Sequence, residues 1–154
     1  MAIESSLPTY GSGLCLSACA ALAVMLAALA SGASKSDVVH PKWPIWMKLE
    51  DVHQIHENIV NVINGSYLHK NAREIRGSGF VVESLEAALW AFASSDSFEE
   101  AVLKAVNLGG DADTTGAIYG QLAGANWGES GIPQHLLADL CGRDFLEAAL
   151  VRIT

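Results

Sequence analysis

Basic residues are scarce in this chain. Nine lysines and arginines stand against seventeen aspartates and glutamates, so the formal net charge is −8 at pH 7. The basic residues are scattered along the sequence, whereas a nucleic-acid-binding surface requires clustered positive charge. We therefore expect no nucleic-acid partner. The negative charge favours solubility and attracts metal cations, but it identifies no partner by itself.

Cysteine is too rare to build a disulfide framework. The chain has three, Cys15, Cys19 and Cys141, and this odd number without paired spacing fits a reducing compartment. We therefore expect a cytoplasmic protein. Cys15 and Cys19 lie one helical turn apart among alanines and leucines. Small buried core residues are the favoured interpretation of this pair, and metal ligands are the alternative.

Several common catalytic motifs are missing from the sequence. It contains no Walker loop, no Cys-x-x-Cys pair and no His-Glu-x-x-His. Ser12 lies between two glycines, but a nucleophile elbow needs one more residue on each side. His53 and His56 are three residues apart on a predicted helix. With no third ligand nearby we interpret them as surface residues, and a metal-binding pair is the alternative.

Long runs of β-branched residues are also missing, and alanine and leucine dominate instead. Apolar residues make up 51% of the 154 residues and the mean hydropathy is +0.28, enough for one domain with a real core. This composition predicts an all-α fold, and no segment is typical of a strand in a sheet. We predict a single compact multi-helix domain over residues 1–154, with residues 1–11 as an irregular lead-in.

The spacing of apolar residues locates the predicted helices. They are expected over about residues 12–31, 48–63, 80–93, 97–107, 113–126, 134–141 and 143–152. Ser97 and Glu100 have the form of a capping box at the start of one helix. The segment 33–46 contains two prolines and is expected to be a loop.

Residues 14–30 form the one stretch that resembles a membrane span or a signal peptide. The residues before it contain Glu4 and no lysine or arginine, the opposite of a charged signal-peptide start. Alanine is weakly hydrophobic for a membrane span, and Ser17 interrupts the run. We therefore interpret this stretch as a buried helix and expect no membrane association.

The most informative segment is Leu108-Gly109-Gly110-Asp111-Ala112-Asp113-Thr114-Thr115. Asp111, Asp113 and Thr114 supply two carboxylates and a hydroxyl just before a predicted helix. Such hard oxygen donors suit Mg²⁺ or Mn²⁺, and the paired glycines let the chain turn so that the acidic side chains converge. The alternative is helix capping, with Asp113 as the N-cap and Asp111 interacting with the helix dipole.

The predicted helix that follows carries Gly116, Gly120 and Gly124 at four-residue steps, which places them on one face. Each glycine costs a helix about 1 kcal/mol relative to alanine. The stripe therefore predicts that another backbone approaches this face closely. Helix packing is the favoured reason, and the approach of a substrate is the alternative.

Several segments resemble the ADP-ribosylglycohydrolase family in their order and spacing. They are residues 77–92, 97–101, 107–114, 120–125 and 131–133, and the alanine-rich stretch 14–32 is also similar to a family helix. The Gly-Gly-Asp-x-Asp-Thr element is the most specific of these. The resemblance implies an all-helical fold that uses two Mg²⁺ or Mn²⁺ ions to release ADP-ribose from modified side chains or related conjugates.

The resemblance also implies roles for individual residues. Asp111, Asp113 and Thr114 would be metal ligands, with Asp113 bridging the ions, and Gly79 and Phe80 would line the substrate. An earlier part of family members supplies an acidic residue and a Thr-Asp-Asp cluster. This sequence has no Asp-Asp pair and no Thr-Asp, and it corresponds to the later half of a full-length member. We therefore assign no catalytic acid or base.

Three functional hypotheses follow. The chain is a truncated ADP-ribosylglycohydrolase-like hydrolase with impaired activity or a need for a partner, a non-catalytic module that binds ADP-ribose or a nucleotide, or a self-associating structural remnant. Half of a helical domain exposes apolar surface, and such surface usually finds a partner. We therefore expect a homodimer, in which the second copy could occupy the space of the absent half.

Overall fold

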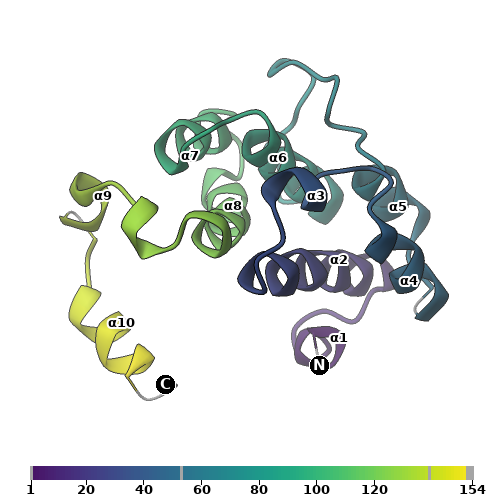
Figure 1. Ribbon diagram of the computed structural model, residues 1–154, viewed down its shortest axis with the longest axis horizontal. Coiled ribbons are helices and arrows are strands. Elements are labelled where there is room, and N and C mark those ends of the chain that lie inside the picture. The colour runs from purple at the N-terminus through teal and green to yellow at the C-terminus, as the bar shows by residue number, and fades with distance from the viewer. Residues whose placement is uncertain (1, 53, 139, 152–154) are drawn as a thin grey trace.

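The computed structural model describes residues 2–52, 54–138 and 140–151. Every regular element in these ranges is a helix, which confirms the predicted all-α class (Figure 1). The longest are α2 (Gly13–Ala30), α6 (Val81–Ala93) and α8 (Ala112–Trp127). The shorter ones are α1 (Ala2–Ser6), α3 (Lys35–Val38), α4 (Pro44–Val52), α5 (Glu57–Ile63), α7 (Phe98–Val106), the 3-10 turn η1 (Glu129–Gly131), α9 (Gln134–Ala138) and α10 (Arg143–Leu150).

Helix α8 lies at the centre of the core. It packs against α6, α7 and α2, and α2 packs in turn against α5 and α6. Tyr119 and Leu122 of α8 and Phe92 of α6 have no exposed surface. Full burial of an apolar side chain of this size stabilises a fold by about 1.5–3 kcal/mol. The core therefore fixes α8 firmly, and with it the first turn that carries the predicted metal ligands.

The contact between α7 and α8 combines small and polar groups. Ala101 and Ala105 of α7 are completely buried, so their methyl groups let the two helices approach closely. The Tyr119 hydroxyl donates a hydrogen bond to the Phe98 carbonyl at 2.8 Å. An unsatisfied buried hydroxyl would cost about 1–3 kcal/mol. This bond therefore favours one orientation of α7 on α8.

The helices predicted over 12–31, 80–93, 97–107 and 113–126 are confirmed as α2, α6, α7 and α8. The Ser12 hydroxyl caps α2 by accepting the Cys15 N–H at 3.2 Å. Ser97 caps α7 in the same way through the Glu100 N–H, also at 3.2 Å. Each cap is worth about 1 kcal/mol. The predicted capping box at Ser97 is half formed, because the Glu100 carboxylate accepts the Asp96 N–H.

The prediction for residues 33–63 is wrong in two places. The expected loop 33–46 contains α3 and the start of α4, and the expected helix 48–63 is divided into α4 and α5. Ser34 and Asp37 form a complete capping box that supports α3 despite the nearby prolines. His56 starts α5, where its Nδ1 accepts the Asn58 N–H at 3.2 Å. The apolar spacing continues across this break, so the spacing alone does not indicate that α4 and α5 are separate helices.

The lead-in predicted for residues 1–11 is not wholly irregular. It contains α1, which packs against α2, and Ile3 contacts the core. The Cys19 thiol lies 3.5 Å from the Ser6 hydroxyl oxygen and helps to join the two helices. Cys15 and Cys19 are free and half-buried. This arrangement agrees with their interpretation as small packing residues of α2.

Helix α2 is the one helix in the described ranges that is long and apolar enough to cross a membrane. It packs against α1, α3, α5, α6 and α8, and its residues Ala21 and Met25 have no exposed surface. The central helix of a folded core has the same length and composition as a short membrane span. Six of the eighteen residues of α2 are buried, so packing within the fold accounts for part of its apolar character.

Shortening a buried side chain of α8 tests this arrangement. Leu122→Ala should lower the free energy of unfolding by about 2–5 kcal/mol, because the lost methyl groups leave a cavity. Leu103→Ala on α7 is the control, since Leu103 is 50% exposed and should change stability by about 0.5 kcal/mol or less. Urea unfolding followed by circular dichroism measures both. Equal losses in the two variants would contradict the burial of this face of α8.

Candidate metal and substrate site

The candidate site lies where the loop before α6 meets the turn before α8. The Asp111 N–H donates a hydrogen bond to the Gly77 carbonyl at 2.7 Å. Gly109 and Gly110 have φ values of +73° and +65°, a region that favours glycine. A Cβ atom at Gly110 would lie 2.1 Å from the Gly77 oxygen. A Cβ atom at Gly77 would in turn lie 2.7 Å from the Gly109 oxygen, so the two backbone segments meet this closely because glycine occupies both positions 77 and 110.

Asp111, and not Asp113 as the capping alternative supposed, is the N-cap residue of α8. Its side chain makes no capping hydrogen bond within the described structure. The cap is made by the backbone, because the Asp111 carbonyl accepts both the N–H and the hydroxyl of Thr115 at 3.1 Å. The Asp111 carbonyl therefore satisfies the start of α8 at Thr115, while the Asp111 carboxylate interacts with Thr114 and Asp113.

The three predicted metal ligands converge. Hydrogen bonds with the side chains of Thr114 and Asp113, together with the Thr114 N–H, hold the pKa of Asp111 below its ordinary value. Asp111 and Thr114 are half-buried and Asp113 is exposed. The side chains of these three residues therefore lie close together at the start of α8.

The predicted substrate residues adjoin this cluster. A Cβ atom at Gly79 would lie 2.7 Å from Oδ2 of Asp111, so the loop passes directly beside the carboxylate. Gly79 and Phe80 also line a cavity of about 360 Å³. Its other lining residues are Tyr10, Ser12, Leu14, Cys15 and Val81. The structure thus brings the predicted metal ligands and substrate residues to one place.

Five lining residues of this cavity were not predicted as site residues: Val81 and, from the segment at the start of α2, Tyr10, Ser12, Leu14 and Cys15. The last four reach it because the start of α2 lies beside the start of α6. Tyr10 is 64% exposed and Phe80 is 50% exposed, so both rings are accessible to a ligand. In the sequence, Tyr10 followed by Gly-Ser-Gly just before a predicted helix could have indicated a ligand-binding position.

The described residues supply only part of a metal site. Asp111, Asp113 and Thr114 offer three hard oxygen donors, whereas Mg²⁺ takes about six. No group of three or more His, Cys, Asp and Glu side chains suited to a metal occurs within the described ranges. The donor chemistry fits Mg²⁺ or Mn²⁺, and water or further polypeptide would have to complete the coordination.

The remaining candidates from the sequence lie elsewhere. His56 serves as the cap of α5, and His53 lies outside the described residues. The glycine stripe of α8 meets a close neighbour only at Gly116, where a Cβ atom would lie 3.3 Å from Val106. Nothing in the described structure lies within 4 Å of a Cβ atom at Gly120 or Gly124. The predicted close approach of another backbone is therefore found at none of the three glycines within the described residues, because the neighbour of Gly116 is a side chain.

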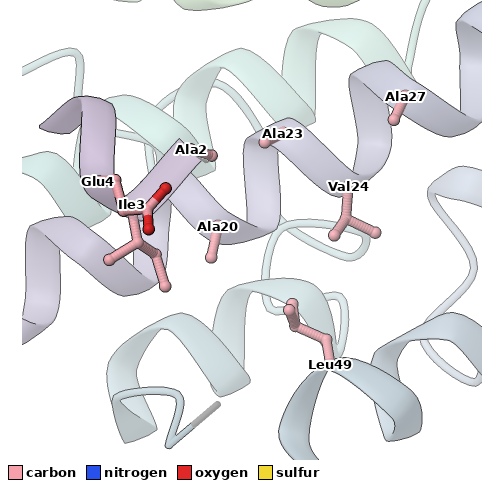
Figure 2. Close-up of a pocket in the computed structure, with 8 residues that line it drawn as sticks. All are labelled: Ala2, Ile3, Glu4, Ala20, Ala23, Val24, Ala27 and Leu49. Atoms are coloured by element: carbon pink, nitrogen blue, oxygen red, sulfur yellow. The ribbon is translucent and has the colours of Figure 1, made fainter. Parts of the chain in front are cut away.

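A second cavity, of about 460 Å³, is separate from this site. Figure 2 shows it between α1, α2 and α4, where Ile3, Val24 and Leu49 join a row of alanines. Glu4 supplies a carboxylate to the lining. None of the lining residues belongs to the cavity beside Gly79. We therefore regard this second cavity as a surface groove and not as part of the candidate site.

Comparison with known sequences identifies the family of the chain. The sequence model of the ADP-ribosylglycohydrolase family matches residues 1–154. The chain belongs to this family. Its fold also matches a solved ADP-ribosylglycohydrolase-related protein complex with a TM-score of 0.81 and 37% identity. The match covers 95% of this chain and 48% of the solved chain.

Curated relatives share this part of the family sequence. An ADP-ribosylarginine hydrolase Tri1 of Pseudomonas putida (strain GB-1) is 37% identical over 131 residues, which cover 85% of this chain and 33% of that protein. The Tri1 protein of Serratia proteamaculans (strain 568) is 36% identical over 137 residues, 89% of this chain and 35% of that protein. The chain therefore spans about a third of the length of these relatives.

A third relative matches a shorter part of the chain. The ADP-ribosyl-[dinitrogen reductase] glycohydrolase of Rhodospirillum rubrum is 40% identical over 65 residues, 42% of this chain and 22% of that protein. The names of these relatives thus specify different substrates, ADP-ribosylarginine in one case and ADP-ribosylated dinitrogen reductase in the other. The family assignment is therefore firmer than any assignment of a substrate.

Alanine substitution at two glycines tests the backbone contact at the site. Gly110→Ala should lower the free energy of unfolding by about 1–3 kcal/mol from its positive φ alone, and more from the clash with Gly77. Gly120→Ala is the control, because its Cβ atom meets open space and should stabilise α8 by up to about 1 kcal/mol. Thermal unfolding measures both changes. A Gly110→Ala variant as stable as the wild type would contradict the described contact.

Proposed function

We propose that this chain carries part of a metal-dependent site that hydrolyses ADP-ribosyl linkages. The convergence of Asp111, Asp113 and Thr114 beside Gly79 carries the proposal. Bound Mg²⁺ or Mn²⁺ would orient ribose hydroxyls and act as a Lewis acid. The Tri1 relatives are named ADP-ribosylarginine hydrolases, so the ADP-ribosylarginine linkage is the first substrate class to test.

Different residues of this chain would bind the metal ion and the organic ligand. Asp111, Asp113 and Thr114 would hold the ion through their oxygen atoms. Gly79 has no side chain, so a ligand in the cavity can come close to the Asp111 carboxylate. The accessible rings of Tyr10 and Phe80 offer apolar faces to a planar group such as adenine. The cavity can therefore receive a nucleotide-like ligand next to the ion-binding oxygens.

Proton transfer is the part of the reaction that these residues do not supply. The lowered pKa of Asp111 keeps its carboxylate ionised near neutral pH, which suits cation binding and not proton donation. We therefore propose that hydrolysis by this chain alone is weak. Further polypeptide, in the same chain or another, would add the missing metal donors and a general acid or base.

Binding without turnover is the second candidate function. The three-donor site favours it, because a cation held by so few protein oxygens is bound weakly and polarises a substrate poorly. The cavity beside Gly79 is lined without the three metal-ligand candidates, so a ligand could bind there in the absence of a metal. A chain of this kind would recognise ADP-ribose or a related nucleotide and leave it intact.

Removing one carboxylate separates these functions. Wild-type protein should bind Mn²⁺ weakly, with a Kd of roughly a millimolar, and should bind ADP-ribose more tightly when Mn²⁺ is present. Asp113→Ala should abolish this Mn²⁺ dependence in calorimetry. Asp144→Ala is the matched control, because Asp144 lies in the first turn of α10 and its loss changes the net charge equally.

Release of ADP-ribose from an ADP-ribosylated arginine peptide then distinguishes the two candidates. Slow release by the wild type that is lost in Asp113→Ala supports the hydrolase. Binding of ADP-ribose without release supports the binding module. A wild-type protein that binds neither Mn²⁺ nor ADP-ribose would contradict both candidates.

We also propose that the chain forms a homodimer in the cytoplasm. Large apolar side chains are exposed on α10 and α4, with Phe145 84% and Met47 72% exposed. Helix α10 stands apart from the other helices in Figure 1. The groove in Figure 2 is a further apolar surface. Such surface favours self-association, and the three free cysteines agree with a reducing compartment.

The proposed dimer is tested in solution. Sedimentation velocity at micromolar concentration should show a dimer, and Phe145→Ser should shift it toward monomer because it removes exposed apolar area. Leu103→Ser, which changes an exposed leucine of α7, should leave the association state unchanged. A wild-type protein that is a monodisperse monomer at these concentrations would rule the dimer out.

A further inference from the structure

The loop of residues 77–80 serves both parts of the candidate site. Gly77 accepts the hydrogen bond from the Asp111 N–H, and Gly79 lies against the Asp111 carboxylate. Phe80 ends the loop as the N-cap residue of α6 and lines the adjoining cavity. A shift of this loop would therefore move the Asp111 carboxylate and the wall of the cavity together.

The side chain of Phe80 makes no capping hydrogen bond to α6, but its backbone N–H is held by a neighbouring residue. The Ser78 hydroxyl accepts the Phe80 N–H at 3.2 Å and donates its own hydrogen to Oε2 of Glu83. Glu83 lies in the first turn of α6, a helix held in the core by Leu85 and Phe92. The loop is thus attached to a rigid element through Ser78 and Glu83.

Glu83 holds both neighbours of Gly77. One carboxylate oxygen binds Ser78, and the other lies 3.7 Å from Nη1 of Arg76. The Arg76 side chain is 80% exposed, and an ion pair of that kind contributes little. The hydroxyl–carboxylate bond is charge-assisted and stronger. Ser78 is therefore the main link, and Arg76 is a weaker second one.

We propose that Glu83 is a positioning residue: through Ser78 it fixes the 77–80 loop, and so holds the Asp111 carboxylate in its place for metal binding. Among the described contacts Glu83 touches neither Asp111, Asp113 nor Thr114, and it acts through the Gly77 carbonyl. The inference rests on the proposed function for its metal-binding consequence. The mechanical link itself does not depend on a metal.

Glu86 provides a matched control on the same helix. Its carboxylate accepts hydrogen bonds from Lys70 Nζ at 2.7 and 2.8 Å and from the Ser66 hydroxyl. It therefore has the same partner types as Glu83, a cation and a serine. It has no described contact with the 77–80 loop. Glu83→Gln and Glu86→Gln change the charge equally, and only the first should affect the site.

Amide hydrogen exchange measured by NMR tests the link without any metal. Exchange at the Asp111 N–H should become at least about tenfold faster in Ser78→Ala, which removes the link, and measurably faster in Glu83→Gln, which keeps an acceptor oxygen but loses the charge-assisted bond to Ser78 and the ion pair with Arg76. Glu86→Gln should leave this rate within about twofold of the wild type. The amides of Leu89 and Phe92 report on the core of α6 and should keep their wild-type rates in every variant.

Calorimetric titration with Mn²⁺ gives the second readout. The Kd should rise at least about threefold in Glu83→Gln and Ser78→Ala, and should stay unchanged in Glu86→Gln. Unchanged exchange at Asp111, or equal acceleration at Asp111, Leu89 and Phe92, would overturn the positioning role. A wild type that binds no Mn²⁺ but shows the selective exchange effect would overturn the proposed metal function and leave the link between Glu83 and Asp111 established.

Discussion

The whole site depends on one backbone contact, the hydrogen bond from the Asp111 N–H to the Gly77 carbonyl at 2.7 Å. It joins two turns that are far apart in the sequence. The contact needs glycine at position 110, where a methyl group would meet the Gly77 oxygen at 2.1 Å. An unpaired N–H at the start of a buried helix is costly, so this bond also satisfies the backbone of α8. One contact therefore stabilises the helix and aims its carboxylates.

The core determines where this contact can form. Helix α8 is fixed by Tyr119 and Leu122, and α6 by Leu85 and Phe92. These side chains set the positions of the two helix starts, while the loops before them carry the polar groups. The burial of apolar area is not directional, whereas the hydrogen bonds at the helix starts require a particular geometry. The packed helices are rigid, and hydrogen bonds such as Ser78–Glu83 attach the loops before them to these helices.

The sequence predicted local features better than contacts between distant segments. Asp111, Asp113 and Thr114 were predicted as one cluster because all three belong to one turn, and the cap at Ser97, predicted from its own neighbours, is confirmed. The sequence did not predict the break before α5, because the N-cap residue there is His56 and histidine is not among the preferred N-cap residues. The apolar spacing therefore indicated one continuous helix. Tyr10 and Ser12 were missed because their place beside Phe80 depends on how α2 packs, which no local pattern encodes.

Core and metal site place different demands on the described residues. Hydrophobic stabilisation grows gradually with buried area, so a packed core can form from these helices although the chain spans about a third of its Tri1 relatives. A divalent cation instead needs a fixed number of oxygen ligands, about six for Mg²⁺. Asp111, Asp113 and Thr114 offer oxygen-bearing side chains at the start of α8, where the core and the Gly77 contact hold the backbone. This helix start can therefore form without a complete set of metal ligands, because packing and metal coordination are separate requirements.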